Sequence, residues 1–349
     1  MCFWEVVGQW CLELAGTALN SFCPVETLLL TKFGGKRRSR RWRTGGGLIY
    51  ASWGRFLGFC RRFRTLGVKV FEKGQARPIF PRKLPHILVT DVAGEVVEVG
   101  EGVKNFKVGD KVVAMLSYGN GGGLGEFAAA NAEMVVARPS EVSAAEGAGL
   151  PVAALSAHWA LTKDAEIKLD GTGKQKNILI TGASGNVGLY AIQLAKLENA
   201  HVIATCGARN IELVRSLGVN EVLDYKTPEG EAVKSPSGRK YDFVIHSASQ
   251  AIPWSVFEPN LSTNGKVIDL TLGPSSLFTF VLKKLTFSKK TLVPLIISLK
   301  GENLDCLVKL VKEGKLKTVI DSSFPLSKAE DAWAKRLDGN NTGKIIVEH

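Results

Sequence analysis

The segment that most constrains the fold of this chain is residues 177–206, NILITGASGNVGLYAIQLAKLENAHVIATC. An apolar run leads into three glycines, Gly182, Gly185 and Gly188, and a helical pattern then leads into a second apolar run. The glycines have G-x-x-G-x-x-G spacing between a predicted strand and a predicted helix, where a side chain at Gly185 would block a pyrophosphate. The helix N-terminus would supply free N–H groups to its phosphates. The segment predicts a dinucleotide site, with a plain strand-to-helix turn as the simpler alternative.

Further strand and helix patterns follow this turn. The helical patterns are clearest at residues 187–197 and 210–217. The predicted strands are residues 177–182, 201–206, 221–225, 241–247 and 265–271. Strands that alternate with helices indicate the α/β class and a doubly wound parallel sheet.

The chain on either side of this unit has a different character. Residues 91–115 alternate apolar and polar positions with glycines between them, which is typical of short antiparallel strands. A helix is expected at residues 327–339 and a last strand at 342–349. The end of the chain is therefore expected to complete the first domain. The predicted division begins with an atypical basic segment at residues 1–70 and a first part of a catalytic domain at residues 71–144. A nucleotide-binding domain follows at residues 145–290, and residues 291–349 return to the catalytic domain.

The end of the second predicted strand distinguishes between dinucleotides. An NAD site usually carries an acidic residue about 20 residues after the glycine turn, where it binds the ribose hydroxyls. Here residues 204–210 read ATCGARN and contain no acid, but they contain Arg209. Arginine suits a 2′-phosphate through charge-assisted hydrogen bonds, so NADP(H) is favoured over NAD(H). A solvated arginine at a helix start is the alternative.

The net charge of +12 comes mostly from the first part of the chain. Residues 1–75 hold 13 Lys and Arg against 4 Glu, so about nine of the twelve positive charges lie there. This asymmetry indicates a tail or an arm rather than a basic main body. Three interpretations of residues 1–70 stay open: an organelle-targeting segment, a basic arm for nucleic acid or anionic lipid, or a stretch produced by an incorrect gene model that does not fold with the rest.

Several segments resemble one known family. They are DVAGEVVEVGEGVKNFKVGDKV, GLPVAALSA, GASGNVGLYAIQLAK, GARNIELVRSLGVNEVLDYKTPEG and the terminal GKIIVE. In this order they are similar to the zinc-independent quinone oxidoreductase branch of the medium-chain dehydrogenase/reductases, and in particular to its plant plastid members. The resemblance runs from about residue 73 to the end of the chain. It implies a Rossmann domain inserted into a GroES-like β-rich catalytic domain that both chain ends form, with the cofactor between the two domains.

The resemblance also implies roles for individual residues. Ser156, Ser247, Leu270 and Thr271 would lie near the nicotinamide. The pyrophosphate would lie on residues 184–187, which are Ser184, Gly185, Asn186 and Val187. The 2′-phosphate would be bound by Arg209, Asn210 and Tyr225, and Lys344 would approach from the far edge of the cleft.

Two departures from the family bear on this. Asn186 stands where the family usually has a second consecutive glycine, and a small cost is expected because Asn tolerates unusual backbone angles. The family's NPxD stretch, whose Asn helps to hold the nicotinamide, has no counterpart in residues 63–74, FRTLGVKVFEKG. If this lobe is incomplete, the chain would bind NADPH without turnover, and this stays an alternative.

The expected activity is hydride transfer from NADPH to quinones or to the C=C bond of α,β-unsaturated carbonyls, including oxylipin-type enones and ketols. No metal is expected, because the chain lacks the cysteine and histidine set of the zinc enzymes; His201 and His246 lie in apolar strands and are expected to be packed residues. Cys206 and Cys306 are expected to be buried thiols. No catalytic residue is assigned. Tyr118 is a candidate carbonyl donor or pocket wall, next to a glycine-rich loop at residues 119–125 that would open for bulky substrates or be a disordered surface loop.

The resemblance also implies a location and partners. The plastid inner envelope is expected, as a peripheral contact, with the cytoplasm as second choice and a homodimer as the assembly. No apolar run reaches the roughly 18 residues of a membrane-spanning helix. A basic run at residues 36–43 lacks a folded recognition element, so nucleic acid is not an expected partner, although a basic-arm nucleic-acid or membrane binder is kept as an alternative.

Overall fold

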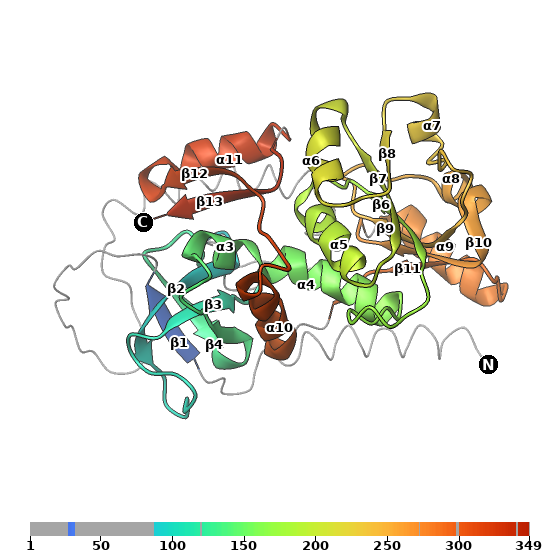
Figure 1. The fold of residues 1–349 in the computed structure, drawn as a ribbon. Helices are drawn as coiled ribbons and strands as arrows, with labels where there is room; N and C mark the ends of the chain where they lie inside the picture. The colour runs from blue at the N-terminus through green and yellow to red at the C-terminus, as the bar shows by residue number, and fades with distance from the viewer. Residues whose placement is uncertain are drawn as a thin grey trace.

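The structure is a computed structural model that describes residues 27–31, 87–118, 121–271, 273–297, 300–339 and 341–348. A six-stranded sheet has the order β11-β10-β9-β6-β7-β8, and all of its pairings are parallel. Its strands are β6 (Asn177–Thr181), β7 (His201–Cys206), β8 (Glu221–Asp224), β9 (Tyr241–His246), β10 (Leu261–Asp269) and β11 (Thr291–Pro294). The predicted α/β class with a doubly wound parallel sheet is confirmed (Figure 1).

The central strand β6 shows why this sheet is buried on both faces. Ile178 and Ile180 pack into one apolar cluster and Leu179 into another, so successive side chains serve opposite faces. A continuous apolar run is the expected pattern for a parallel strand that is covered on both sides. The helices of the structure are α3 (Ala144–Gly149), α4 (Pro151–Trp159), α5 (Asn186–Leu197), α6 (Ile211–Ser216), α7 (Pro228–Glu231), α8 (Trp254–Phe257), α9 (Pro274–Leu285), α10 (Gly301–Lys312) and α11 (Ala329–Leu337).

A second sheet is antiparallel, with the order β4-β1-β2-β3-β5. Its strands are β1 (Thr27–Thr31), β2 (Asp91–Val99), β3 (Lys111–Met115), β4 (Phe127–Asn131) and β5 (Val135–Ala137). The strand β1 comes from the predicted atypical segment and lies between β2 and β4. The rest of residues 1–70 lies outside the described residues, and so does the comparison with the family's NPxD stretch at residues 63–74.

The C-terminal part of the chain returns to this second sheet. After α10, the strands β12 (Ile320–Pro325) and β13 (Lys344–Glu348) pair in parallel, and α11 packs against both. Figure 1 shows these elements beside α3 and β2, away from the six-stranded sheet. The predicted helix at residues 327–339 is present as α11, which is two residues shorter at each end, and the predicted strand at residues 342–349 is present as β13, which begins two residues later.

One detail differs from expectation. Cys306 is exposed, because on α10 it lies opposite the buried residues Leu304, Leu307 and Val308; Cys206 is buried as expected. The edge strand β11 and the residue that follows it are mostly buried, since Leu292 and Leu295 pack inside, whereas Ile296 is exposed. Of the part of the chain that the structure describes, no helix has the length and apolar character to cross a bilayer.

Candidate cofactor site

The parallel sheet brings the predicted site residues to one edge. The strands β6, β7, β8, β9 and β10 are parallel, so their carboxyl ends meet at the same edge. The chain order also reverses beside β6, because β7 lies on one side of it and β9 on the other. Ligands of open α/β sheets bind in the crevice at such a switch point. The predicted residues that directly follow these strand ends are Ser184, Gly185, Arg209, Asn210, Tyr225, Ser247, Leu270 and Thr271.

The three glycines of the turn differ in how strictly the surrounding backbone requires a residue without a side chain. Gly182 has a φ of +65°, and a Cβ there would lie 2.8 Å from the backbone nitrogen of Ala248. A Cβ at Gly188 would lie 2.5 Å from the carbonyl oxygen of Gly182. A Cβ at Gly185 would meet only that same oxygen, at 3.1 Å. The fold itself therefore requires Gly182 and Gly188, whereas a Cβ at Gly185 would make one tight contact with a backbone oxygen and otherwise face open space.

The start of α5 is suited to an anion. Gly185 is its N-cap residue and no side chain caps the first N–H groups, which are the groups that bind phosphates at helix N-termini. The side-chain oxygen of Asn186 is buried and has no hydrogen-bond partner within the described chain. Asn186 is the first residue of α5 and does not have a positive φ, so no backbone cost arises from the missing second glycine. These features fit a dinucleotide pyrophosphate on residues 184–187.

The ends of β7 and β8 form the neighbouring part of the edge. The Tyr225 ring lies beside Gly207, since a Cβ on that glycine would be 3.3 Å from it. Arg209 is exposed, while Asn210 is buried and its Oδ1 accepts a hydrogen bond of 2.9 Å from the Thr342 hydroxyl. The cation and the amide follow β7, whose end contains no acid, and the phenol follows Asp224 at the end of β8. A cation, an amide and a phenol form a donor set that fits a phosphate monoester.

The residues predicted near the nicotinamide have internal partners. The Ser247 hydroxyl donates to the Thr181 carbonyl over 2.8 Å, and the Leu270 N–H donates to the His246 carbonyl over 3.0 Å. The N–H and hydroxyl of Thr271 both donate to the Asp269 carboxylate. These bonds fix the backbone just past the ends of β6, β9 and β10.

Ser156 differs from the residues at the strand ends because it lies on a helix. It is buried in α4, and its hydroxyl donates to the Val152 carbonyl one turn earlier, over 2.7 Å. Its helix packs against α5.

A buried histidine lies directly beneath the site. His246 is 1% exposed, and its Nδ1 lies 2.7 Å from the Thr181 hydroxyl. Burial lowers the pKa of His246, and the nearby Asp269 opposes this more weakly. The ring is therefore neutral at pH 7. It packs edge-on against Phe257, as expected for a core residue.

The C-terminal segment at residues 341–344 links the site to the second sheet through hydrogen bonds and a salt bridge. The Gly343 N–H donates to the Ser184 carbonyl over 3.3 Å, and Thr342 reaches Asn210 as described above. Lys344 forms a salt bridge of 3.0 Å with Asp91, and both side chains are mostly buried. The other oxygen of Asp91 accepts the Val152 N–H at the start of α4. Sequence reasoning selected Lys344 but missed Thr342, Gly343 and Asp91; the nearest signal is the TGK that precedes the last strand.

The glycine-rich loop is only partly within the described residues. Gly121 forms a β-bridge with Ile87, and the N–H groups of Gly123 and Leu124 donate to the carbonyls of Val89 and Leu88. The expectation of a disordered surface loop is therefore wrong for residues 121–124, because backbone hydrogen bonds hold them. Tyr118 is 41% exposed.

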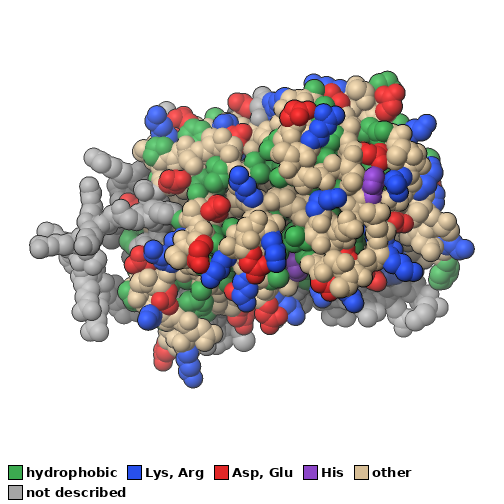
Figure 2. Space-filling view, viewed as in Figure 1, with side chains coloured by type: hydrophobic (Ala, Val, Ile, Leu, Met, Phe, Trp, Pro, Cys, Tyr) green, Lys and Arg blue, Asp and Glu red, His purple; other side chains and the backbone are tan. Residues whose placement is uncertain are grey.

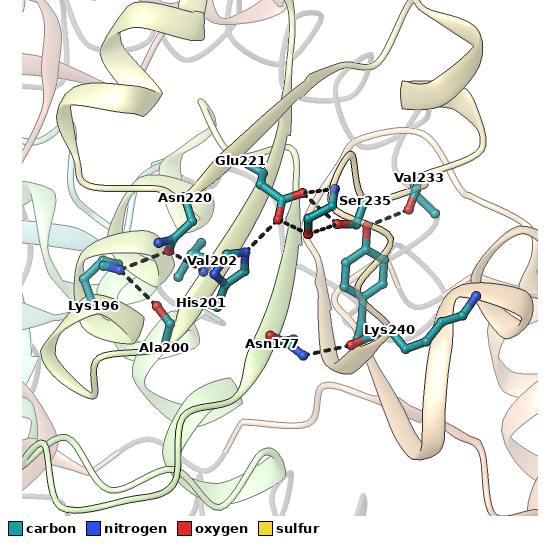
Figure 3. Close-up of polar contacts among 12 residues, drawn as sticks. Asn177, Lys196, Ala200, His201, Val202, Asn220, Glu221, Val233, Ser235 and Lys240 are labelled. Carbon is teal, nitrogen blue, oxygen red and sulfur yellow. Dashed lines mark hydrogen bonds and ion pairs between the residues drawn. The ribbon is translucent and has the colours of Figure 1, made fainter.

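A separate polar cluster lies at the opposite edge of the sheet, where β7 and β8 begin (Figure 3). The Glu221 carboxylate lies 2.7 Å from His201 Nε2 and accepts hydroxyl hydrogen bonds from Ser235 and Ser237. Burial would raise the pKa of Glu221, but these hydrogen bonds outweigh it and lower it to about 2. His201 is the first residue of β7 and its side chain is mostly buried, with the Glu221 carboxylate as its hydrogen-bond partner. The cluster stabilises the sheet away from the site.

Over the described residues, no group of three His, Cys, Asp or Glu is arranged to hold a metal ion. Lys and Arg side chains are interspersed with Asp and Glu over the face that Figure 2 shows. The described body of the protein therefore has mixed charge on this face.

Known families and proteins resemble the chain over most of its length. Residues 65–140 match the alcohol dehydrogenase GroES-like domain, and residues 217–347 match the zinc-binding dehydrogenase family. The chloroplast envelope quinone oxidoreductase homologue of Arabidopsis thaliana is 69% identical over 277 residues, which cover 79% of this chain and 84% of the relative. The 2-methylene-furan-3-one reductase of Solanum lycopersicum is 32% identical over 276 residues, or 76% of this chain and 64% of that protein. The structure of the quinone oxidoreductase from Coxiella burnetii superposes with a TM-score of 0.67 at 28% identity, over 76% of this chain and 80% of that one.

Proposed function

We propose a function from one premise: the chain belongs to the medium-chain dehydrogenase/reductase superfamily, in its quinone oxidoreductase group. It is an NAD(P)H-dependent oxidoreductase of the quinone oxidoreductase type. Beyond this, the protein is an NADPH-dependent reductase that works without zinc. Its substrates are quinones or the C=C bond of α,β-unsaturated carbonyls.

One observation carries the choice of cofactor. The open space over Gly185 and the uncapped start of α5 suit a pyrophosphate, and the adjacent strand end presents Arg209 and Asn210 in place of an acid. An acid there would bind a free 2′-hydroxyl and repel a 2′-phosphate. This arrangement supports NADP(H) over NAD(H).

The proposed substrate class follows from the chemistry of the nicotinamide cofactor. Bound NADPH supplies a hydride, which adds to an electron-poor carbon of the substrate. Reduction of an enone then needs one proton at the α-carbon of the enolate, from solvent or a weak acid. The tomato relative named above is a reductase of an exocyclic enone, which supports this class for the present chain.

The protein's own residues position the cofactor and the substrate and hold the shape of the cleft. The hydrogen bonds of Ser247, Leu270 and Thr271 hold the strand ends that we propose as the nicotinamide side. The salt bridge of Lys344 with Asp91 and the hydrogen bond of Gly343 to Ser184 hold the cleft edge where the two sheets meet. Such positioning is the main contribution expected of a protein whose cofactor carries the reaction.

The name of the Arabidopsis relative refers to the chloroplast envelope, which supports a plastid location for this chain. We propose that the protein contacts the envelope membrane peripherally. A homodimer is the proposed assembly.

The test is a comparison of Arg209→Gln with the unaltered protein. Fluorescence titration should give a Kd for NADPH that rises about tenfold to one-hundredfold, because one charge-assisted contact to a phosphate is lost. The Kd for NADH should change by less than about twofold. Lys168→Gln, an exposed cation in the loop before β6 and outside the proposed set, is the matched control.

Turnover is measured in the same preparations, as NADPH oxidation with a benzoquinone and with a linear enone. Tight NADPH binding without oxidation of either would support the alternative of a binding protein with an incomplete lobe. Equal affinity for NADPH and NADH in the unaltered protein would refute the cofactor assignment.

A further inference from the structure

The helix α9 leaves an apolar stripe uncovered. Phe278, Val281, Leu282 and Leu285 are all exposed, and their spacing of i, i+3, i+4 and i+7 places them on one face of the helix. Phe287, just after the helix, is 92% exposed. These five residues are called the α9 surface below. Isolated exposed apolar residues are ordinary, but a contiguous stripe with two phenylalanines marks an interaction site.

The rotation of α9 is fixed from its other side. The Ser276 hydroxyl is buried and donates to the Asp269 carboxylate, and Phe280 packs into the core cluster of this face of the sheet. Lys283 forms a salt bridge of 2.8 Å with Glu258 and lies over the Trp254 ring. The α9 surface therefore points away from the protein, at the outer edge of the six-stranded sheet beside β11 (Figure 1).

The charge around the α9 surface has one sign. Residues 270–301 contain five lysines, Lys283, Lys284, Lys289, Lys290 and Lys300, and no Asp or Glu. Lys283 is neutralised by Glu258, whereas Lys284 and Lys289 are exposed next to the stripe. An apolar helix face with phenylalanine and leucine, flanked by lysines, has the composition of a helix that lies in the interface of an anionic bilayer.

We propose that the α9 surface binds the surface of an anionic phospholipid bilayer, with its apolar side chains among the acyl chains and Lys284 and Lys289 at the headgroups. This deepens, and rests on, the proposed peripheral membrane contact. A second copy of the chain fits less well, because a two-fold contact through α9 would set this lysine-rich segment against itself. The inserted helix has 12 residues and lies along the bilayer surface.

The test is flotation of the purified full-length protein with vesicles of neutral phosphatidylcholine and with vesicles that also contain phosphatidylglycerol. The unaltered protein should bind only the anionic vesicles, and binding should fall with added salt. Phe278→Ser combined with Leu285→Ser should weaken the partition constant at least about tenfold, because two apolar side chains no longer enter the membrane.

Lys284→Gln combined with Lys289→Gln tests the charges. A lysine near an anionic surface contributes about 1 kcal/mol, or about fivefold, so loss of this pair should weaken binding by about twenty-fivefold and reduce its salt dependence. The matched controls are Val108→Ser and Lys104→Gln, at exposed positions in the second domain, which should leave binding unchanged. The altered side chains are all exposed, and the thermal midpoint confirms that each variant is folded.

Three results would overturn the proposal: no binding of the unaltered protein to anionic vesicles at low salt, equal binding by the α9 variants, or a dimer that Phe278→Ser with Leu285→Ser dissociates while vesicle binding stays the same. The last result, seen by analytical ultracentrifugation, would assign the α9 surface to a second copy. NADPH affinity is measured alongside, so a failure here is distinguishable from a failure of the proposed cofactor site.

Discussion

Thr342 links the C-terminal segment to the proposed 2′-phosphate side of the cofactor, and its replacement by valine isolates that link. The Thr342 hydroxyl donates to Asn210 Oδ1 over 2.9 Å, so the amide nitrogen of Asn210 is left to donate elsewhere. Valine keeps the shape and removes the donor. The backbone N–H of Thr342 still donates to Asp321, so the segment itself should stay in place.

The size of the effect follows from burial. Asn210 is 8% exposed, so its oxygen would lose a partner that water cannot easily replace. An unsatisfied buried acceptor costs about 1–3 kcal/mol, and we expect a loss of this size in the free energy of unfolding. The freed amide can also rotate and turn its oxygen toward the phosphate. The Kd for NADPH should therefore rise about fivefold to twentyfold, while the Kd for NADH rises less than about twofold.

Urea unfolding measures the stability and fluorescence titration measures both affinities. Thr342→Ser, which keeps the hydroxyl, should restore at least most of the NADPH affinity. If Thr342→Val weakens NADPH and NADH equally, the residue supports the cleft in general and does not orient Asn210. If neither affinity changes while stability falls, Asn210 does not contact the phosphate.

Two further outcomes are expected. Gly185→Val should abolish cofactor binding while it lowers the free energy of unfolding by less than about 1 kcal/mol, and Gly188→Ala should lower that free energy by more than about 2 kcal/mol. The reason is that a Cβ at Gly188 would lie within 2.5–2.9 Å of three backbone atoms, whereas a Cβ at Gly185 would meet a single backbone oxygen at 3.1 Å. Unfolding and titration of both variants would contradict this if the order of stability were reversed. The pKa of Glu221 is lowered from 4.5 to about 2, so its contribution is complete above pH 4.5 and is lost as the pH falls toward 2. The loss should be at most about 3 kcal/mol, and Glu221→Gln should remove most of this pH dependence of unfolding; an identical acid profile in the variant would refute it.

The sequence predicted those parts of the fold that have a local periodic signal. The apolar runs of β6 and β7 and the glycines between them gave the strand–turn–helix unit to within a residue at each end. Pro151 is the first residue of α4, a position where the missing N–H of proline costs nothing.

Contacts between distant residues have no such signal. The salt bridge between Asp91 and Lys344 joins positions 253 residues apart, and neither residue type indicates the other. Asp91 read as one polar position of an alternating strand. Likewise, a sequence pattern can show that a helix such as α9 has an apolar side but not whether the rest of the chain leaves that side uncovered.

The hydrogen bond from Gly343 to Ser184 also determines the order in which parts of the fold can form while the chain is being synthesised. The glycine turn leaves the ribosome early, and its strand and helix can pack as soon as the neighbouring strands exist, since domains generally fold as units during synthesis. The cleft edge has to wait until 159 more residues have been made and residues 342–344 reach Ser184, Asn210 and Asp91. A nascent chain would thus acquire a packed nucleotide-binding domain before its cofactor edge is complete, so ribosome-bound intermediates should have native sheet structure and weak affinity for NADPH.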